Sequence, residues 1–176
     1  MRLIAWFMVS VAVMVGGESA HADDPCAAFT WDVRHERTLF AKEPQAAVAG
    51  EALATSPTLA TEKLYQLNLR RQAEVTFAAP PGKKSAGDGT YGGLAKLTVD
   101  TAGVYRLSLD QPLWVDVLAN GAVLPAKDFQ GRKACNAPHK IVEFLLPAGT
   151  PITLQFSGGN IPAVKITVTH GPAQAP

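Results

Sequence analysis

From residue 63 onward, hydrophobic and polar positions alternate in short stretches. In the stretch 103–109, for example, Tyr105, Leu107 and Leu109 are separated by Arg106 and Ser108. An alternation of this kind predicts a strand with one buried face and one wet face. Further strands are expected over the other stretches of this type, which turn residues separate: 64–69, 74–77, 94–99, 114–118, 141–146, 152–156 and 164–168. The pair Asn120-Gly121, which follows 114–118, predicts a hairpin turn.

One segment ahead of these strands has a helical period. Over residues 24–43, Phe29, Val33 and Phe40 recur at helical spacing, and Pro44 ends the pattern. Several short strands with turns between them and a single helix predict an all-β fold, namely an antiparallel β-sandwich, jelly-roll-like, with one N-terminal helix.

The first 22 residues have the pattern of a secretory signal peptide. Arg2 precedes an apolar run, and Ala20-His21-Ala22 places small residues where a signal peptidase reads. The alternative is an uncleaved anchor, but the run is shorter than the roughly 20 residues that span a bilayer. We therefore expect cleavage after Ala22 and a periplasmic or secreted protein with no membrane span after cleavage.

These patterns divide the chain into four parts. Residues 1–22 are the expected signal peptide, and 23–62 are a helix and loop packed on the body. Residues 63–170 form the β-sandwich, and 171–176 form a flexible tail.

Charge and composition narrow the class of partner. Lys and Arg number 16 against 15 Asp and Glu, so the chain has no basic field and no nucleic-acid partner is expected. Hydrophobic residues make up 47% and charged residues 18%, which is typical of a globular protein.

Two cysteines, Cys26 and Cys135, follow the leader. In an oxidising compartment an even count favours one disulfide, which would tie the N-terminal segment to the later body. Free thiols or metal ligands are the alternative, although the chain has no CxxC motif.

No catalytic constellation is evident. The chain has no GxSxG motif, and His35, His139 and His170 fall in a helix, a loop and a strand end. We therefore expect no catalytic residue and no cofactor.

An alternative reading gives a small cupin-like metal oxygenase. His139 and Glu143 have the spacing of half of the cupin metal-binding pattern. The other two ligand positions hold Ala137 and Ile152, neither of which binds a metal. His139 and Glu143 are the metal ligands under this reading.

A binding surface is the leading interpretation. Exposed aromatic rings stack on sugar rings, and nearby carboxylates and amides bind hydroxyl groups. The candidates are Trp114, Asp116, Asn120 and Asp128. A period of two places Val115 and Val117 in the core and Trp114 on the opposite face, where it is either partly exposed or covered by the N-terminal helix.

The chain also resembles known exported proteins. The resemblance is carried by the following residues: Phe29-Thr30-Trp31-Asp32, Tyr91-Gly92-Gly93, Ala102-Gly103-Val104-Tyr105, Trp114-Val115-Asp116-Val117, Phe129-Gln130-Gly131, Cys135 and Leu154-Gln155-Phe156-Ser157-Gly158. They look like a family of small exported bacterial β-sandwich proteins of unestablished role. Some members carry the label homogentisate dioxygenase, which implies an iron held by His, His and Glu. The second half is similar to pre-peptidase C-terminal domains, which are accessory modules of exported enzymes.

Together these observations favour an exported, non-catalytic binding or accessory module of the bacterial envelope. The expected partner is a polysaccharide or an envelope protein. A purely structural envelope protein and the metal oxygenase are the alternatives.

Overall fold

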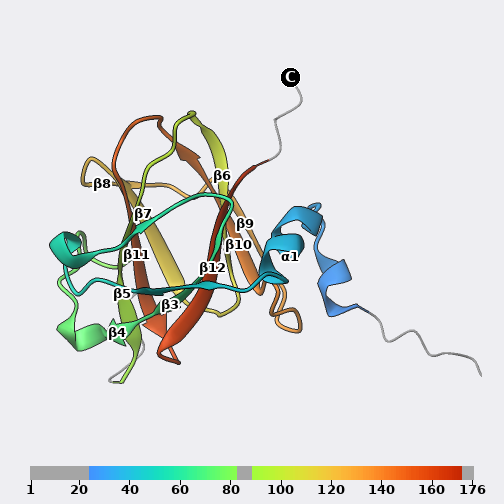
Figure 1. The fold of residues 1–176 in the computed structure, drawn as a ribbon, viewed down its shortest axis with the longest axis horizontal. Coiled ribbons are helices and arrows are strands. Elements are labelled where there is room, and N and C mark those ends of the chain that lie inside the picture. Colours follow the sequence, from blue (N-terminus) through green and yellow to red (C-terminus); the bar gives the residue numbers. More distant parts are fainter. Residues whose placement is uncertain (1–23, 83–88, 172–176) are drawn as a thin grey trace, which may run out of the picture.

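The computed structural model describes residues 24–82 and 89–171, which form two β-sheets packed face to face (Figure 1). The predicted signal peptide and residues 172–176 of the predicted tail lie outside the described residues. Within the described ranges, no helix is both long and apolar enough to cross a membrane.

We call the two sheets A and B. In spatial order, sheet A contains β1 (Gln45–Val48), β3 (Leu64–Asn68), β12 (Ala163–His170), β6 (Gly103–Leu109), β10 (Lys140–Leu146) and β9 (Asp128–Gly131). Sheet B contains β2 (Thr58–Leu59), β5 (Tyr91–Leu97), β11 (Ile152–Gly159), β7 (Trp114–Ala119) and β8 (Ala122–Leu124), and β4 (Arg70–Arg71) also pairs with β5.

The connectivity is that of a jelly roll. Eight main strands follow one another along the chain as β3, β5, β6, β7, β8, β10, β11 and β12. In sheet A the first lies beside the eighth, then the third and the sixth; in sheet B the second lies beside the seventh, then the fourth and the fifth. This double-sheet arrangement confirms the predicted all-β sandwich.

The first two strands of the chain precede the predicted start of the sandwich. β1 pairs with β3, and β2 pairs with β5, both in parallel. The remaining strand pairs are antiparallel within the described chain. The segment 44–62, expected to be a loop with room for one short strand, therefore supplies an edge strand to each sheet, because a short stretch can pair with an exposed edge without a strong pattern of its own.

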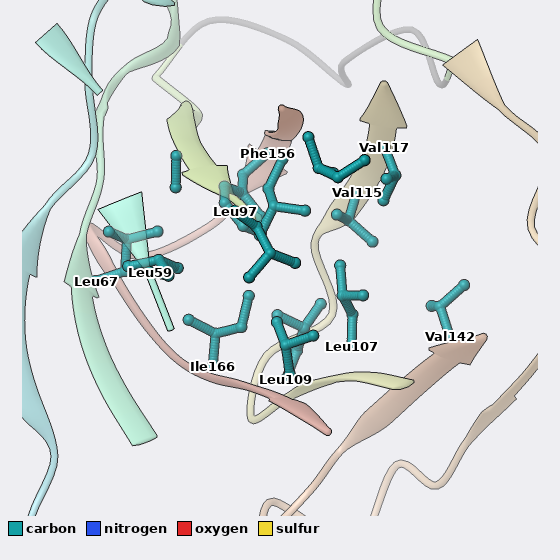
Figure 2. Close-up of a cluster of buried hydrophobic side chains, with 14 of the residues drawn as sticks. Leu59, Leu67, Leu97, Leu107, Leu109, Val115, Val117, Val142, Phe156 and Ile166 are labelled. Carbon is teal, nitrogen blue, oxygen red and sulfur yellow. The ribbon is translucent and has the colours of Figure 1, made fainter. Parts of the chain in front are cut away.

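Alternating side chains fill the space between the sheets (Figure 2). Leu107, Leu109 and Ile166 come from sheet A, while Val117 and Phe156 come from sheet B, and all five are fully buried. Val115 is also buried, so the predicted core pair of Val115 and Val117 is confirmed. Burying each such side chain contributes about 1.5–3 kcal/mol before entropy is counted.

The predicted single helix over 24–43 is wrong in its backbone, because the segment forms two short helices. They are η1 (Pro25–Ala28), a 3-10 helix, and α1 (Arg34–Phe40). Each begins after an aspartate whose carboxylate accepts a hydrogen bond from a backbone N–H, Asp24 from Cys26 at 2.9 Å and Asp32 from Arg34 at 3.1 Å. Such local bonds compete with a continuous helix.

Two further expectations about local structure are settled, and two short strands were unexpected. The stretch 74–77, predicted as a strand, begins at the end of a 3-10 turn, η3 (Gln72–Glu74), and then runs irregularly. The short strands β8 and β9 were not predicted. The Asn120-Gly121 turn between β7 and β8 has φ of +50° and +79°, the geometry of a two-residue hairpin.

The predicted disulfide between Cys26 and Cys135 is present, with a Cα–Cα distance of 4.9 Å. It ties residues 24–43, which we call the N-terminal cover, to the chain just ahead of β10. Phe29, Val33 and Ile141 pack around it as a second, smaller core. Figure 1 shows α1 beside β12, so the cover lies on the outer face of sheet A.

The outer face of sheet B is covered too. Residues 75–82, which we call the strap, hydrogen-bond to side chains of β7 and β11: the Ala79 backbone to Gln155 at 3.0 and 3.2 Å, and Gly82 N–H to Asp116 at 3.1 Å. Arg106 and Ser108, predicted to face water, are buried beneath the N-terminal cover. The alternation therefore predicted correctly on which face of the strand each side chain lies, but it did not predict that the outer face is buried.

Candidate functional site

Trp114 stands at the start of β7, on the outer side of sheet B. Its side chain is 37% exposed, and the N-terminal cover lies on the other sheet. The indole Nε1 donates a hydrogen bond to Asp116 Oδ1 at 2.7 Å, and Lys140 Nζ lies 5.3 Å from the ring centroid. The indole is thus partly exposed and held in one orientation.

A shallow hollow of about 260 Å³ opens beside this ring, which we call the aromatic hollow. Phe129, 67% exposed, stands on its wall and comes from β9 of sheet A. The full lining is Pro112, Leu113, Trp114, Phe129, Gly131, His139 and Lys140. Both sheets therefore contribute an exposed aromatic ring to one surface, beside the basic side chains His139 and Lys140.

Asp116, a predicted binding residue, is buried and fully used within the protein. Its carboxylate accepts hydrogen bonds from Trp114 Nε1, from Gly82 N–H and, at 3.3 Å, from Gln155 Nε2. A Cβ added at Gly82 would lie 2.6 Å from Asp116 Oδ1, so glycine is required for the strap to approach. Asp116 orients Trp114 and does not face the hollow.

The other two predicted binding residues lie elsewhere. Asn120 forms the turn at the far end of β7, about 20 Å from Trp114 at the usual rise per residue. Asp128 begins β9 in sheet A, where its carboxylate accepts a hydrogen bond from the N–H of Phe129. Of the four predicted residues, only Trp114 lines the aromatic hollow.

Sequence reasoning missed Phe129 and Lys140 as site residues and gave His139 a different role. A signal was present in Asp128-Phe129-Gln130-Gly131, where a large apolar residue stands among polar and small ones. An isolated aromatic residue of this kind gives no indication of whether it faces a core or a surface.

His139 and Glu143 do not converge on a metal site. Glu143 is buried in β10, where its Oε1 accepts a hydrogen bond from Arg106 Nε at 3.0 Å. His139 is four residues earlier, about 13 Å along an extended chain, and lines the aromatic hollow. Within the described ranges no three His, Cys, Asp or Glu side chains are placed to hold a metal. These residues do not fit the iron that the dioxygenase label implies.

A larger hollow, of about 460 Å³, lies between α1 and sheet A, and we call it the helix hollow. Its lining is Asp32, Arg34, His35, Glu36, Thr38, Arg106 and His170. Arg106 and Glu36 are buried at its floor, while Arg34 and His35 stand at its exposed rim. Of these lining residues, only Arg106 lies in the alternating stretch 103–109.

The polar side chains at the rim are each paired with a carboxylate. Arg34 Nη2 lies 2.5 Å from Asp32 Oδ2, and His35 Nε2 lies 2.5 Å from Glu62 Oε2. The hydrogen bond from the Arg34 side chain, aided by the Arg34 backbone N–H, holds the pKa of Asp32 well below its usual range. Asp32 therefore stays ionised and occupied by Arg34.

Comparisons with known proteins identify no relative of this chain. No protein-family model matches the chain, and a search of curated proteins finds no significant match.

Proposed function

We propose that the protein is an exported, non-catalytic binding module that binds a polysaccharide at the aromatic hollow. The observation that carries the proposal is the pair of exposed rings, Trp114 and Phe129, which two different sheets bring to one hollow. Aromatic faces bind the apolar faces of sugars, and the polar groups of His139 and Lys140 beside them suit hydroxyl groups.

The fixed orientation of Trp114 supports a binding role. Its indole N–H is already bonded to Asp116, and the strap closes over that carboxylate through Gly82. A ring that is held in place before the ligand arrives loses little freedom on binding. Asp116 and Gly82 therefore act as positioning residues for Trp114.

Export is part of the same proposal. The leader pattern of residues 1–22 is that of a secreted protein, and the Cys26–Cys135 disulfide is of the kind that persists in oxidising compartments. A polysaccharide of the cell envelope is a ligand that such a module would meet there.

The test is binding to a panel of soluble polysaccharides, neutral, uronic and amino, by calorimetry on the disulfide-bonded protein. We expect Phe129→Ala and Trp114→Ala each to weaken binding at least about tenfold, the loss of one good stacking contact. Leu145→Ala is the matched control, since Leu145 is 64% exposed on β10 and does not line the hollow.

Circular dichroism confirms that each variant is folded. If the wild type binds no polysaccharide of the panel, or if Phe129→Ala binds as tightly as Leu145→Ala, the proposal is wrong. In that case a capture experiment with envelope proteins tests the other expected partner.

A further inference from the structure

The floor of the helix hollow contains an unequal number of buried charges. Arg106 Nη1 lies 3.3 Å from Glu36 Oε1, and Arg106 Nε lies 3.0 Å from Glu143 Oε1. The three side chains are between 3% and 10% exposed. Counted as formal charges, one cation faces two carboxylates, so the buried cluster has an excess of one negative charge.

Glu36 also has an unused hydrogen-bonding atom. Its Oε1 accepts hydrogen bonds from Arg106 Nη1 and from the Thr169 hydroxyl. Its Oε2 is buried and has no hydrogen-bond partner among the described residues. Buried carboxylate oxygens are costly to leave unpaired, so a donor at this position would be strongly favoured.

The described residues around the floor do not supply the missing cation. In the described chain, the ion pairs of Glu36 and Glu143 both come from Arg106. Arg34 and His35 at the rim are bonded to Asp32 and Glu62. Arg37, on the same helix, is paired with Asp24 at 2.6 Å.

The wall of the hollow includes the ring of His170, whose Nδ1 lies 2.9 Å from the Gly171 carbonyl oxygen. The hollow thus combines an excess negative charge at its floor with a lining residue, Glu36, that has an unpartnered carboxylate oxygen, within a volume of small-molecule size.

We propose that the helix hollow is a second binding site, separate from the aromatic hollow, for a small molecule that carries a primary ammonium group. Glu36 Oε2 is buried in the unliganded protein, so the carboxylate turns toward the hollow as the ammonium group binds, accepts a charge-assisted hydrogen bond from it and has its charge balanced. The exposed lining residues, Arg34 and Thr38 among them, leave the hollow open for the rest of the molecule.

The test titrates the disulfide-bonded protein with 1,4-diaminobutane and with glucosamine, followed by NMR or calorimetry. N-acetylglucosamine, which has no ammonium group, is the ligand control. We expect the two amines to bind and the acetylated sugar to bind at least about tenfold more weakly in this hollow, because it cannot make the charge-assisted bond.

Three variants decide where the amine binds. Glu36→Gln is expected to lower amine affinity at least about tenfold, because it removes the excess charge. Thr38→Trp is expected to block the hollow without altering the buried floor. Glu51→Gln, a matched charge change at an exposed glutamate paired with Arg70, is expected to leave affinity within about twofold.

The two binding sites are separable in the same experiment. Trp114→Ala is expected to leave amine binding unchanged, and Glu36→Gln to leave polysaccharide binding unchanged. If no amine binds the wild type, or if Thr38→Trp binds as well as the wild type, the proposal is wrong. A Glu36→Gln variant that binds amines as tightly as the wild type would also overturn it.

Discussion

The two outer faces of the sandwich are both covered by irregular chain, yet the buried carboxylates beneath the two covers differ. Under the strap of sheet B, the oxygens of Asp116 receive three donors, from Trp114, Gly82 and Gln155. Under the N-terminal cover of sheet A, Glu36 keeps one oxygen without a partner in the described chain.

The comparison shows that a buried carboxylate is not in itself a binding site. Asp116 is satisfied by neutral groups and holds a neighbouring aromatic ring in place. Glu36 and Glu143 share a single cation and lie at the floor of a hollow. We infer that the carboxylate under the strap is satisfied within the protein and that the carboxylate under the N-terminal cover is completed by a ligand.

The largest expected effect comes from removing the shared cation. Arg106→Met would leave Glu36 and Glu143 buried without a counter-charge, so we expect the free energy of unfolding to fall by about 3–5 kcal/mol. Urea unfolding measures it. The matched control is Arg37→Met, whose exposed pair with Asp24 should change stability by less than about 1 kcal/mol. Equal losses in the two variants would show that the floor is not isolated from water.

The disulfide tests whether the two covers are independent. Replacing both Cys26 and Cys135 with alanine opens a 109-residue loop, and we expect a loss of about 3 kcal/mol. Trp31 belongs to the N-terminal cover and packs against its small core, and Trp114 is bonded to Asp116 beside the strap, so each reports on one face. In the unbridged protein, fluorescence should change for Trp31 in a Trp114→Phe background. A comparable change for Trp114 in a Trp31→Phe background would contradict the separation.

Asp116 is expected to be structural on the opposite face. Asp116→Ala removes the acceptor of three hydrogen bonds, so we expect a loss of about 2 kcal/mol and faster amide exchange at Gly82. Asp128→Ala is the control, because that carboxylate is exposed and should contribute less than about 0.5 kcal/mol. Unchanged exchange at Gly82 would show that Asp116 does not hold the strap.

The sandwich was predictable because alternation is a local signal. Tyr105, Leu107 and Leu109 face the core as expected, and seven of the eight main strands match a predicted stretch in position. The exception, β8, follows the Asn120-Gly121 turn that the sequence did identify. The helix over 24–43 was half predictable, because its apolar positions are buried. The backbone between η1 and α1 is not helical, however, and Asp32 in that gap accepts a hydrogen bond from the Arg34 N–H.

The candidate site was less predictable because exposure depends on chain far away in sequence. The alternation placed Asp116 beside Trp114, but only the strap decides that Asp116 is buried. In the same way, Arg106 is a wet-face residue until the N-terminal cover lies over it. Phe129 and Trp114 share a hollow because of the jelly-roll connectivity, which no local pattern contains.

The smallest expected effect compares two threonines on the same side of β12. Thr167 and Thr169 are both fully buried beneath the N-terminal cover. The hydroxyl of Thr169 donates to Glu36 Oε1, whereas that of Thr167 has no partner in the described chain.

Valine keeps the shape of threonine and removes only the hydroxyl group. We therefore expect Thr169→Val to lose about 1 kcal/mol, because Glu36 then has one donor fewer, and Thr167→Val to be neutral or slightly stabilising. Thermal unfolding of the two variants side by side measures the difference. Equal losses would mean that the hydroxyl of Thr167 is paired in solution. An atom that has no partner under the N-terminal cover would then not indicate a missing group, and the unpartnered oxygen of Glu36 would no longer support a missing ligand.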